Sequence, residues 1–240
     1  MTPVFTLDQV VPWGRSFGEY RRMFALSESD LRSHILGCAD GPASFNAEAV
    51  TAGHRVVSCD PLYRYTADQI RERVQATSEV ILEQTRRNAD QFVWTTIRSI
   101  DELRAVRMSS METFLADFEA GRREGRYLDA TLPNLPFTPV SFDLALCSHF
   151  LFLYSEQFSE DFHLAAVHDM CRVAKEVRVF PLLALDGERS VHLDVLQKRL
   201  GAEGYAITIE EVPYEFQRRG NQMMRVRAGA RSALSPIRPL

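Results

Sequence analysis

The sequence has few of the features that cross-link a chain, anchor it in a membrane or hold a metal ion. Only four of its 240 residues are cysteines, and no two of them form a C-x-x-C pair. We therefore expect reduced, buried thiols and neither a disulfide framework nor a metal site. No apolar stretch approaches the roughly 18 residues of a membrane-spanning helix, and the first residues lack the basic start of a signal peptide. A cytoplasmic protein without a membrane segment is expected.

An excess of basic charge is also missing. The 28 Lys and Arg residues face 32 Asp and Glu residues, which gives a formal net charge of −4. Because no basic patch interleaved with aromatic residues is present, nucleic acid is not an expected partner. With 45% hydrophobic residues, the chain is long enough to form one α/β domain over residues 1–240. The sequence gives no indication of the oligomeric state.

Residues 33–61 have the pattern of a strand, a glycine turn, a helix, a second strand and an acid. The apolar run at 34–36 suits a strand that is buried on both faces. Pro42 is expected at the first helical position, capped by Asp40 or Gly41. Asp60 follows the second strand, close to the spacing of about 20 residues past a glycine turn at which an acid binds ribose hydroxyls. This stretch predicts half of a mononucleotide-binding unit.

The glycine pattern separates two classes of nucleotide ligand. A pyrophosphate fingerprint is G-x-G-x-x-G, but the third position from Gly37 is Ala39 and the sixth is Pro42. The turn is closer to the G-x-G-x-G turn of class I S-adenosylmethionine-dependent methyltransferases. LPFTPVSFDLALCSHFLF at 135–152 is similar to this family's segment leading into the fourth strand, and DFHLAAVHDMCRVA at 161–174 is similar to its following helix. The chain thus resembles this family, and within it bacterial methyltransferase-like proteins of unassigned substrate.

The resemblance implies a Rossmann-like, seven-stranded and mostly parallel sheet in the order 3-2-1-4-5-7-6, with helices on both faces. It also implies an enzyme that uses S-adenosylmethionine, and the acidic net charge favours a small-molecule methyl acceptor. The sequence departs from the family at Ile35, where many members have an acid, and at 174–176, where the usual Pro-Gly-Gly turn is missing. Two alternatives stay open. One is a non-catalytic protein that binds the cofactor as a sensor or scaffold, and the other is a nicotinamide-dinucleotide oxidoreductase.

The expected cofactor contacts lie at the carboxyl ends of the central strands, where open α/β sheets bind their ligands. Asp60 is expected to hold the ribose. Asp129, which follows a candidate third strand at 126–130, is the nearest match to the family residue that faces adenine. The remaining contacts are expected from the glycine turn and from the residues after Asp60, namely Gly37, Cys38, Ala39, Asp40, Gly41, Pro61 and Leu62.

Cys147 ends the predicted fourth strand at 141–147, and Ser148 and His149 follow it. All three are expected beside the sulfonium of the cofactor. His149 is the candidate catalytic base, because an unperturbed imidazole pKa of about 6.5 suits proton uptake. The alternative is that His149 only forms hydrogen bonds with the backbone at the strand end. His163 and His168 lie five residues apart on a predicted helix, so they face different directions and do not suggest a metal pair.

Residues 1–29 and 229–240 are the two terminal segments of the predicted domain. By the resemblance, the first segment covers the cofactor, and Arg15 pairs with the methionine carboxylate. The alternative is that Trp13 packs on the sheet and Arg15 is solvated. The second segment contains Arg231 and Arg238 together with Pro236 and Pro239, and it is expected to be a flexible, basic and solvated tail.

Residues 67–125 form a crossover that is far longer than an ordinary one. Periodicity predicts a helix at 67–88, a second helix that starts at Ser99 and a third at 110–122. This insertion is either an active-site lid or a helical buttress on the sheet. The remaining predicted elements are a helix at 159–174, a strand at 176–183, a helix at 190–201 and strands at 205–211 and 222–227.

Overall fold

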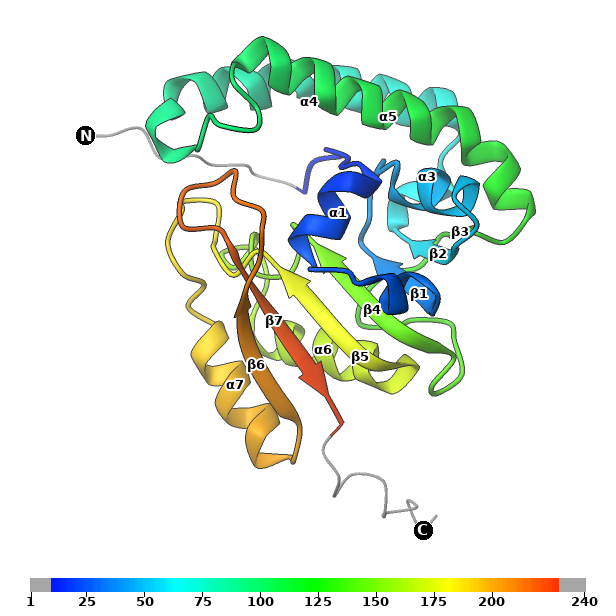
Figure 1. The fold of residues 1–240 in the computed structure, drawn as a ribbon, viewed down its shortest axis with the longest axis vertical. Coiled ribbons are helices and arrows are strands. Elements are labelled where there is room, and N and C mark those ends of the chain that lie inside the picture. The colour runs from blue at the N-terminus through cyan, green and yellow to red at the C-terminus, as the bar shows by residue number, and fades with distance from the viewer. Residues whose placement is uncertain (1–9, 229–240) are drawn as a thin grey trace.

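The computed structural model of the chain describes residues 10–228 and contains one seven-stranded sheet (Figure 1). Its strand order is β3-β2-β1-β4-β5-β7-β6, which confirms the predicted order of the Rossmann-like methyltransferase fold. The first five strands pair in parallel, and β7 runs antiparallel to both β5 and β6. The strands are β1 (His34–Cys38), β2 (Arg55–Cys59), β3 (Tyr127–Leu128), β4 (Phe142–Ser148), β5 (Ala174–Phe180), β6 (Ala206–Glu211) and β7 (Gln222–Arg227).

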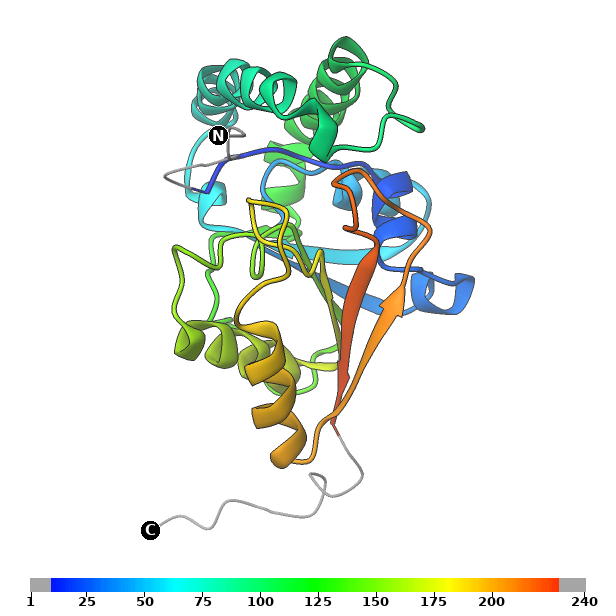
Figure 2. The same cartoon turned by 90° about the vertical axis from the view of Figure 1, so that its left-hand side faces the viewer.

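Helices cover both faces of the sheet (Figure 2). In β1, Leu36 and Cys38 pack with residues of α6 and α7, whereas Ile35 packs with residues of α1 and α3. Successive side chains of a strand point to opposite faces, so an apolar run is what a strand between two helical layers needs. The helices are α1 (Phe17–Met23), α2 (Glu28–Leu31), α3 (Phe45–Thr51), α4 (Ala67–Arg87), α5 (Ile100–Arg123), α6 (Glu160–Val173) and α7 (Leu193–Ala202), with 3-10 turns η1 (Pro61–Arg64) and η2 (Ala89–Gln91).

The helix after β1 begins later than predicted. Ser44 is its N-cap and Phe45 its first residue, so neither Asp40 nor Gly41 caps it and Pro42 is not helical. The reason is the backbone before it, since Ala39 and Gly41 both have a φ of 55°. These left-handed residues extend the turn through Pro42 and delay the helix.

The long crossover forms two helices, α4 and α5, which lie side by side above the carboxyl ends of the strands (Figure 1). The hydroxyl of Ser99 accepts from the backbone N–H of Glu102 and caps α5, as predicted. The predicted separate helix at 110–122 is wrong, because α5 is continuous over 24 residues. Ser110 lies in its interior, where the hydroxyl is buried and is 2.9 Å from the hydroxyl of Ser44.

Three of the four cysteines stand side by side in the centre of the sheet. Cys38 of β1 is in register with Cys59 of β2 and with Cys147 of β4, and all three are buried free thiols. Cys171 on α6 is also free and is partly buried. Within residues 10–228, no group of His, Cys, Asp and Glu side chains is arranged to hold a metal ion, and no helix could cross a membrane.

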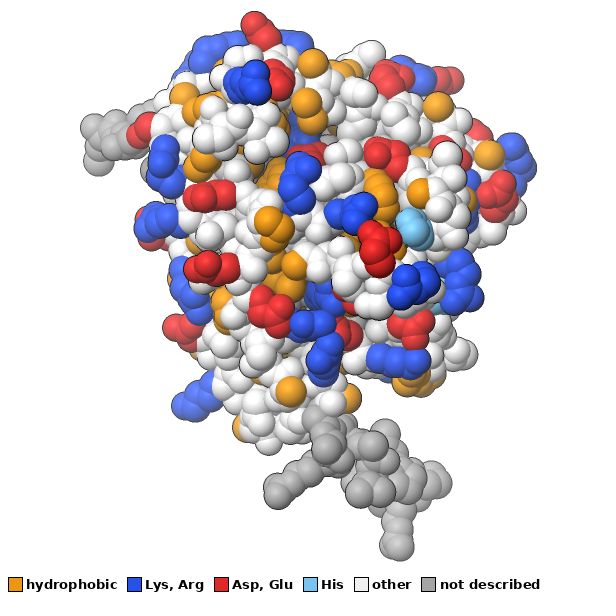
Figure 3. Space-filling model, in the orientation of Figure 1, with side chains coloured by type: hydrophobic (Ala, Val, Ile, Leu, Met, Phe, Trp, Pro, Cys, Tyr) orange, Lys and Arg blue, Asp and Glu red, His pale blue; other side chains and the backbone are white. Residues whose placement is uncertain are grey.

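The surface carries charges of both signs. On the face shown in Figure 3, basic and acidic side chains are interspersed among neutral ones. The predicted tail at 229–240 and the first nine residues lie outside the described residues.

Candidate functional site

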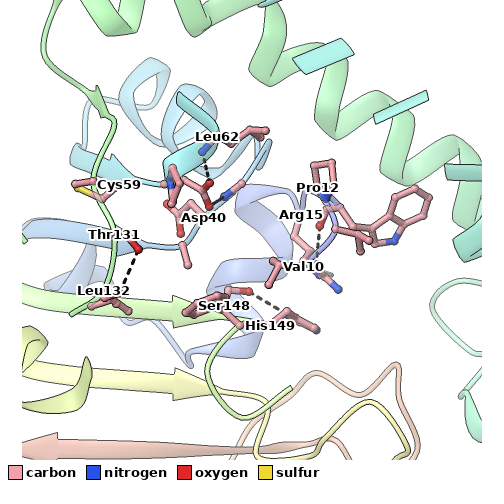
Figure 4. Close-up of a pocket in the computed structure, with 18 of the residues that line it drawn as sticks. Val10, Pro12, Arg15, Asp40, Cys59, Leu62, Thr131, Leu132, Ser148 and His149 are labelled. Atoms are coloured by element: carbon pink, nitrogen blue, oxygen red, sulfur yellow. Dashed lines mark hydrogen bonds between the residues drawn. The ribbon is translucent and has the colours of Figure 1, made fainter. Parts of the chain in front are cut away.

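A cavity of about 370 Å³ lies at the carboxyl ends of the strands, between the sheet and the N-terminal segment. Its volume is within the range of about 300–1,000 Å³ that is usual for small-molecule sites. Figure 4 shows Arg15, Asp40, Leu62, Ser148 and His149 gathered around it from separate segments of the chain. The walls come from residues 39–41 after β1, 59–62 at the end of β2, 130–132 after β3, 148–150 at the end of β4, and from N-terminal residues between 10 and 15.

The cavity brings together most of the residues predicted from the sequence, but not all. Four of the predicted contacts lie outside its lining, namely Gly37, Cys38, Asp129 and Cys147. The predicted residues that line it are Arg15, Ala39, Asp40, Gly41, Asp60, Pro61, Leu62, Ser148 and His149.

Gly37, which was predicted to approach a ligand, lies against the side chain of Asp40. It lies within β1, and a Cβ atom at this position would be 1.8 Å from Oδ2 of Asp40. The missing side chain therefore makes room for the carboxyl of Asp40. Cys38 and Cys147 are the last and the next-to-last residues of β1 and β4, and their side chains point into the core.

The buried carboxyl of Asp40 is held by two hydroxyl groups. Tyr20 donates to Oδ1 at 2.8 Å and Ser58 donates to Oδ2 at 2.6 Å. Burial raises the pKa of Asp40 to about 7, although the hydrogen bonds from Ser58 and Tyr20 favour the charged form. Asp40 therefore gains or loses its proton near neutral pH.

Asp60 joins the turn after β1 to the turn after β2. Its Oδ2 accepts from the backbone N–H of Gly41 at 2.8 Å, and its Oδ1 accepts from that of Leu62 at 2.7 Å. Burial raises its pKa to about 6, which the two backbone hydrogen bonds oppose. At pH 7 the side chain is mainly a carboxylate at the wall of the cavity.

Asp129 lies on the outside of the protein. Its side chain is 44% exposed and forms an ion pair with Arg64, whose Nη2 is 3.1 Å from Oδ1. Because β3 has only two residues, the chain has already left the sheet at this position. Ala130, Thr131 and Leu132 line the cavity in its place.

Ser148, the last residue of β4, and His149 after it form one wall of the cavity. Ser148 Oγ and His149 Nδ1 are 3.0 Å apart, and the backbone N–H of His149 donates to the carbonyl of Phe180. Burial, together with the charges of Arg15 and Arg107, lowers the pKa of His149 well below 6.5. The imidazole is therefore neutral at pH 7 and is a weaker base than an ordinary histidine.

The N-terminal segment places Arg15 at the cavity. Its Nη1 donates to the carbonyl of Trp13 at 2.6 Å, and its Nε is buried without a hydrogen-bond partner. Burial, and next the charge of Arg107, lowers the pKa of Arg15 to about 10. The guanidinium is still charged at pH 7, so a positively charged hydrogen-bond donor lines the cavity.

Sequence reasoning missed the ion pair between Glu19 of α1 and Arg107 of α5. Arg107 Nη1 is 2.8 Å from both carboxylate oxygens of Glu19, and both side chains are buried. A signal was present, because Arg107 falls on the apolar face of its helix, between Leu103 and Met111. A cation on the buried face of a helix needs a partner.

A second, smaller cavity of about 100 Å³ adjoins the first. Four residues line both cavities, namely Val11, Trp13, Arg15 and His149. The smaller cavity is closed by α4 and α5, by residues 153–154 after β4 and by residues 216–217 between β6 and β7. Phe92 lines this cavity, whereas Trp94 packs edge-on against Phe216.

Comparison with known proteins gives one clear relative. The uncharacterized protein MJ0045 of Methanocaldococcus jannaschii is 33% identical over 222 residues, which cover 92% of this chain and 97% of that protein. No family model matches the chain.

Solved structures with a similar fold include methyltransferases. Magnesium protoporphyrin IX methyltransferase ChlM of Synechocystis PCC 6803, with bound SAM, has a TM-score of 0.44 and 11% identity, covering 84% of this chain and 73% of that one. Mitomycin 7-O-methyltransferase MmcR has a TM-score of 0.46 and 11% identity, covering 89% of this chain and 54% of that one. Because both TM-scores are low, the fold assignment rests on the strand order of the sheet.

Proposed function

We propose that this chain, which belongs to the same family as protein MJ0045 of Methanocaldococcus jannaschii, is a methyltransferase that transfers a methyl group from S-adenosylmethionine to a small molecule. The observation that carries the proposal is the position of Asp60. Its carboxylate lies at the wall of a ligand-sized cavity, at the end of β2, and is bonded to the turn that follows β1. In a sheet of this strand order, that is the place where a ribose would be held.

The residues of the cavity fit this cofactor. Each oxygen of Asp60 accepts one backbone N–H, and each carboxylate oxygen can accept two hydrogen bonds, so one site on each is left for a ribose hydroxyl. Leu62 and Leu132 supply apolar surface for the adenine ring. The unpartnered Nε of Arg15 supplies a donor for the methionine carboxylate.

When bound, S-adenosylmethionine supplies a methyl group on a positively charged sulfur, and a lone pair of the acceptor displaces that sulfur, which keeps the bonding electron pair. The part of this chain is to hold the acceptor in line with the methyl group and to exclude water. We place Ser148 and His149 beside the reacting atoms. Because His149 is neutral, it can accept a hydrogen bond that orients the acceptor, and it would take up a proton only from a markedly acidic group.

A non-catalytic role in binding the same cofactor is the second candidate. The weakened basicity of His149, the histidine that lines both cavities, favours it. This role predicts cofactor binding without methyl transfer to any acceptor.

Calorimetric titration with S-adenosylmethionine, with S-adenosylhomocysteine and with NAD tests the proposal. We expect the first two to bind at micromolar concentration and NAD not to bind. Absence of binding by both sulfur compounds would overturn the proposal. Binding of NAD alone would support the oxidoreductase alternative instead.

A further inference from the structure

The ion pair between Glu19 and Arg107 does not neutralise its surroundings. Arg107 and Arg15 line the same small cavity, and the positive charge of Arg107 lowers the pKa of Arg15. Glu19, which is 2.8 Å from Arg107, raises the pKa of both arginines. The single negative charge of Glu19 thus stands against the two positive charges of Arg15 and Arg107.

Both arginines also keep an unused donor. The Nε atoms of Arg15 and Arg107 are buried and have no hydrogen-bond partner among the described residues. The side chain of Arg107 is only 1% exposed, so water does not solvate this N–H freely. Buried polar groups in native proteins nearly always have a partner, and a charged donor gains the most from one. The excess charge and the free donors both point to an anionic acceptor group that binds here.

The rest of the small cavity suits a flat apolar body. Phe92 and Phe216 line it, and their ring centroids are 5.0 Å apart. Trp13 and Tyr154 add further aromatic surface. Most of the remaining wall is aliphatic, from Ile81, Leu103, Leu153 and Leu185, and Thr85 and Gln217 add two polar side chains.

We propose that the smaller cavity is the acceptor site and that the methyl acceptor is a small aromatic acid whose carboxylate is held by the Nε–H of Arg107. This assignment rests on the proposed function, since a cofactor in the larger cavity makes its neighbour an acceptor site. His149 lines both cavities, so the end of the acceptor away from Arg107 would meet the methyl group there.

The cofactor does not remove the need for an acid. Its carboxylate would take the donor of Arg15, but its ammonium and sulfonium groups bring two positive charges with it. Asp40 and Asp60 line the larger cavity and not the smaller one, and both are already bonded within the protein. An acidic group on the acceptor is the remaining source of negative charge beside Arg107.

Calorimetry with benzoate and its neutral analogue benzamide tests the inference on protein saturated with S-adenosylhomocysteine. We expect benzoate to bind at least about tenfold more tightly than benzamide, which corresponds to a charge-assisted hydrogen bond. Equal affinities of the two compounds for the wild-type protein, or no binding of benzoate, would overturn the inference.

Variants then locate the carboxylate. Arg107→Gln alone leaves Glu19 buried and unpaired, so the double variant Glu19→Gln/Arg107→Gln is used, with folding checked by circular dichroism. It should lose about tenfold or more in benzoate affinity. Arg104→Gln is the control, because Arg104 lies one turn away on the same helix and pairs with Glu79 at the surface. Unchanged benzoate affinity in the double variant contradicts the role of Arg107.

The two proposals fail in different ways. Titration with S-adenosylhomocysteine comes first and reports on the cofactor site alone. If it does not bind, the methyltransferase proposal fails, and benzoate titrated into the protein alone then decides whether the anion site exists. If it binds and benzoate does not, only the acceptor assignment fails.

Discussion

Glu19 and Arg107 are 88 positions apart in the chain, and their side chains form a buried ion pair that joins α1 to α5. Tyr214, which follows β6, donates its hydroxyl to the same carboxylate at 2.9 Å. One buried acid thus connects the N-terminal segment, the long helical crossover and the C-terminal hairpin. We propose that this contact fixes α4 and α5 as the roof of the site, which favours a structural role for the insertion over a freely moving lid.

Glu19→Gln should destabilise the fold strongly. Removal of one partner from a buried ion pair leaves an uncompensated charge and costs about 3–5 kcal/mol. Chemical denaturation measures the free energy of unfolding. Glu28→Gln, at a solvent-exposed ion pair with Arg21, is the control and should have little effect. A similar, small loss of stability in both variants would show that the ion pair between Glu19 and Arg107 contributes little to the stability of the fold.

The same acid predicts a loss of stability in strong acid. Burial would raise the pKa of Glu19, but the charge of Arg107 and the hydrogen bonds from Ser16 and Arg107 outweigh it and hold the pKa at about 2. A depressed pKa contributes stability above the unfolded value of 4.5, and this contribution is lost as pH falls from there toward 2. Denaturation curves at several pH values should show the loss in the wild type and a weaker slope in Glu19→Gln.

Asp40 should make the free energy of unfolding change with pH in the opposite direction, closer to neutral pH. Its pKa of about 7 in the folded protein lies above the unfolded value of 3.8, so the folded state binds more protons between these values. The free energy of unfolding should therefore fall as pH rises from about 4 to 7. Asp40→Asn has no proton to lose there and should flatten this slope. Asp60, with a pKa of about 6, leaves a residual slope in the variant. If the free energy of unfolding depends on pH in the same way in the wild type and in Asp40→Asn, the pKa of Asp40 is not raised in the folded protein.

Asp60→Ala should weaken the binding of S-adenosylmethionine by roughly 1.5–3 kcal/mol, which is the size of hydrogen bonds to a charged group. Calorimetry on the folded variant measures the change. Asp68→Ala is the matched control, because Asp68 lies on the surface at the start of α4 and is 88% exposed. Full affinity in Asp60→Ala would rule out its contact with the ribose.

Arg15→Gln should reduce the affinity for both S-adenosylmethionine and S-adenosylhomocysteine by about tenfold, since both carry the carboxylate that Arg15 is proposed to bind. Arg21→Gln, which removes a surface arginine of α1, should bind both compounds normally. If Arg15→Gln also binds them normally, the arginine lies beside the cofactor without touching its carboxylate.

Gly37→Ala should displace the carboxyl of Asp40, because the new Cβ would lie 1.8 Å from Oδ2. Extra bulk in a packed core costs about 1–3 kcal/mol, and thermal unfolding should show the lower stability. Gly18→Ala is the control, since the nearest atom to its added Cβ is 4.0 Å away on a flexible arginine. Equal melting temperatures for the two variants would show that Asp40 can move without loss.

Much of the fold was predictable because its signals are local. The apolar runs of β1 and β4 identify buried strands, and the glycine turn and Asp60 supply residues that line the cavity. The helix boundaries were less predictable. Ser110 resembles a helix start in the sequence, but it lies in the interior of α5 and bonds to Ser44, 66 positions away. Sequence spacing contains no information about such a partner.

The predicted site residues that lie outside the cavity lining do so for physical reasons that the sequence does not show. Gly37 resembles a ligand-binding glycine in the sequence. In the structure, the carboxyl of Asp40 occupies the space that a side chain at position 37 would take. Asp129 leaves the cavity because β3 is only two residues long, which its sequence does not reveal. The pairing of Glu19 with Arg107 could not be read from either segment alone, although the place of Arg107 on an apolar helix face indicated a buried partner.

The buried thiols of Cys38 and Cys147, which unlike Cys59 lie outside the cavity lining, are the protein's own reporters of local opening. Burial raises the pKa of Cys147 to about 12 and that of Cys38 well above its usual value, so neither ionises readily while the strands are paired. An alkylating reagent can modify these two thiols only in molecules whose central strands have separated. The rate of modification therefore measures how often the strands separate. A ligand that bridges the ends of β1 and β2 would slow the reaction, so labelling of these thiols would detect ligand binding without any knowledge of the reaction catalysed.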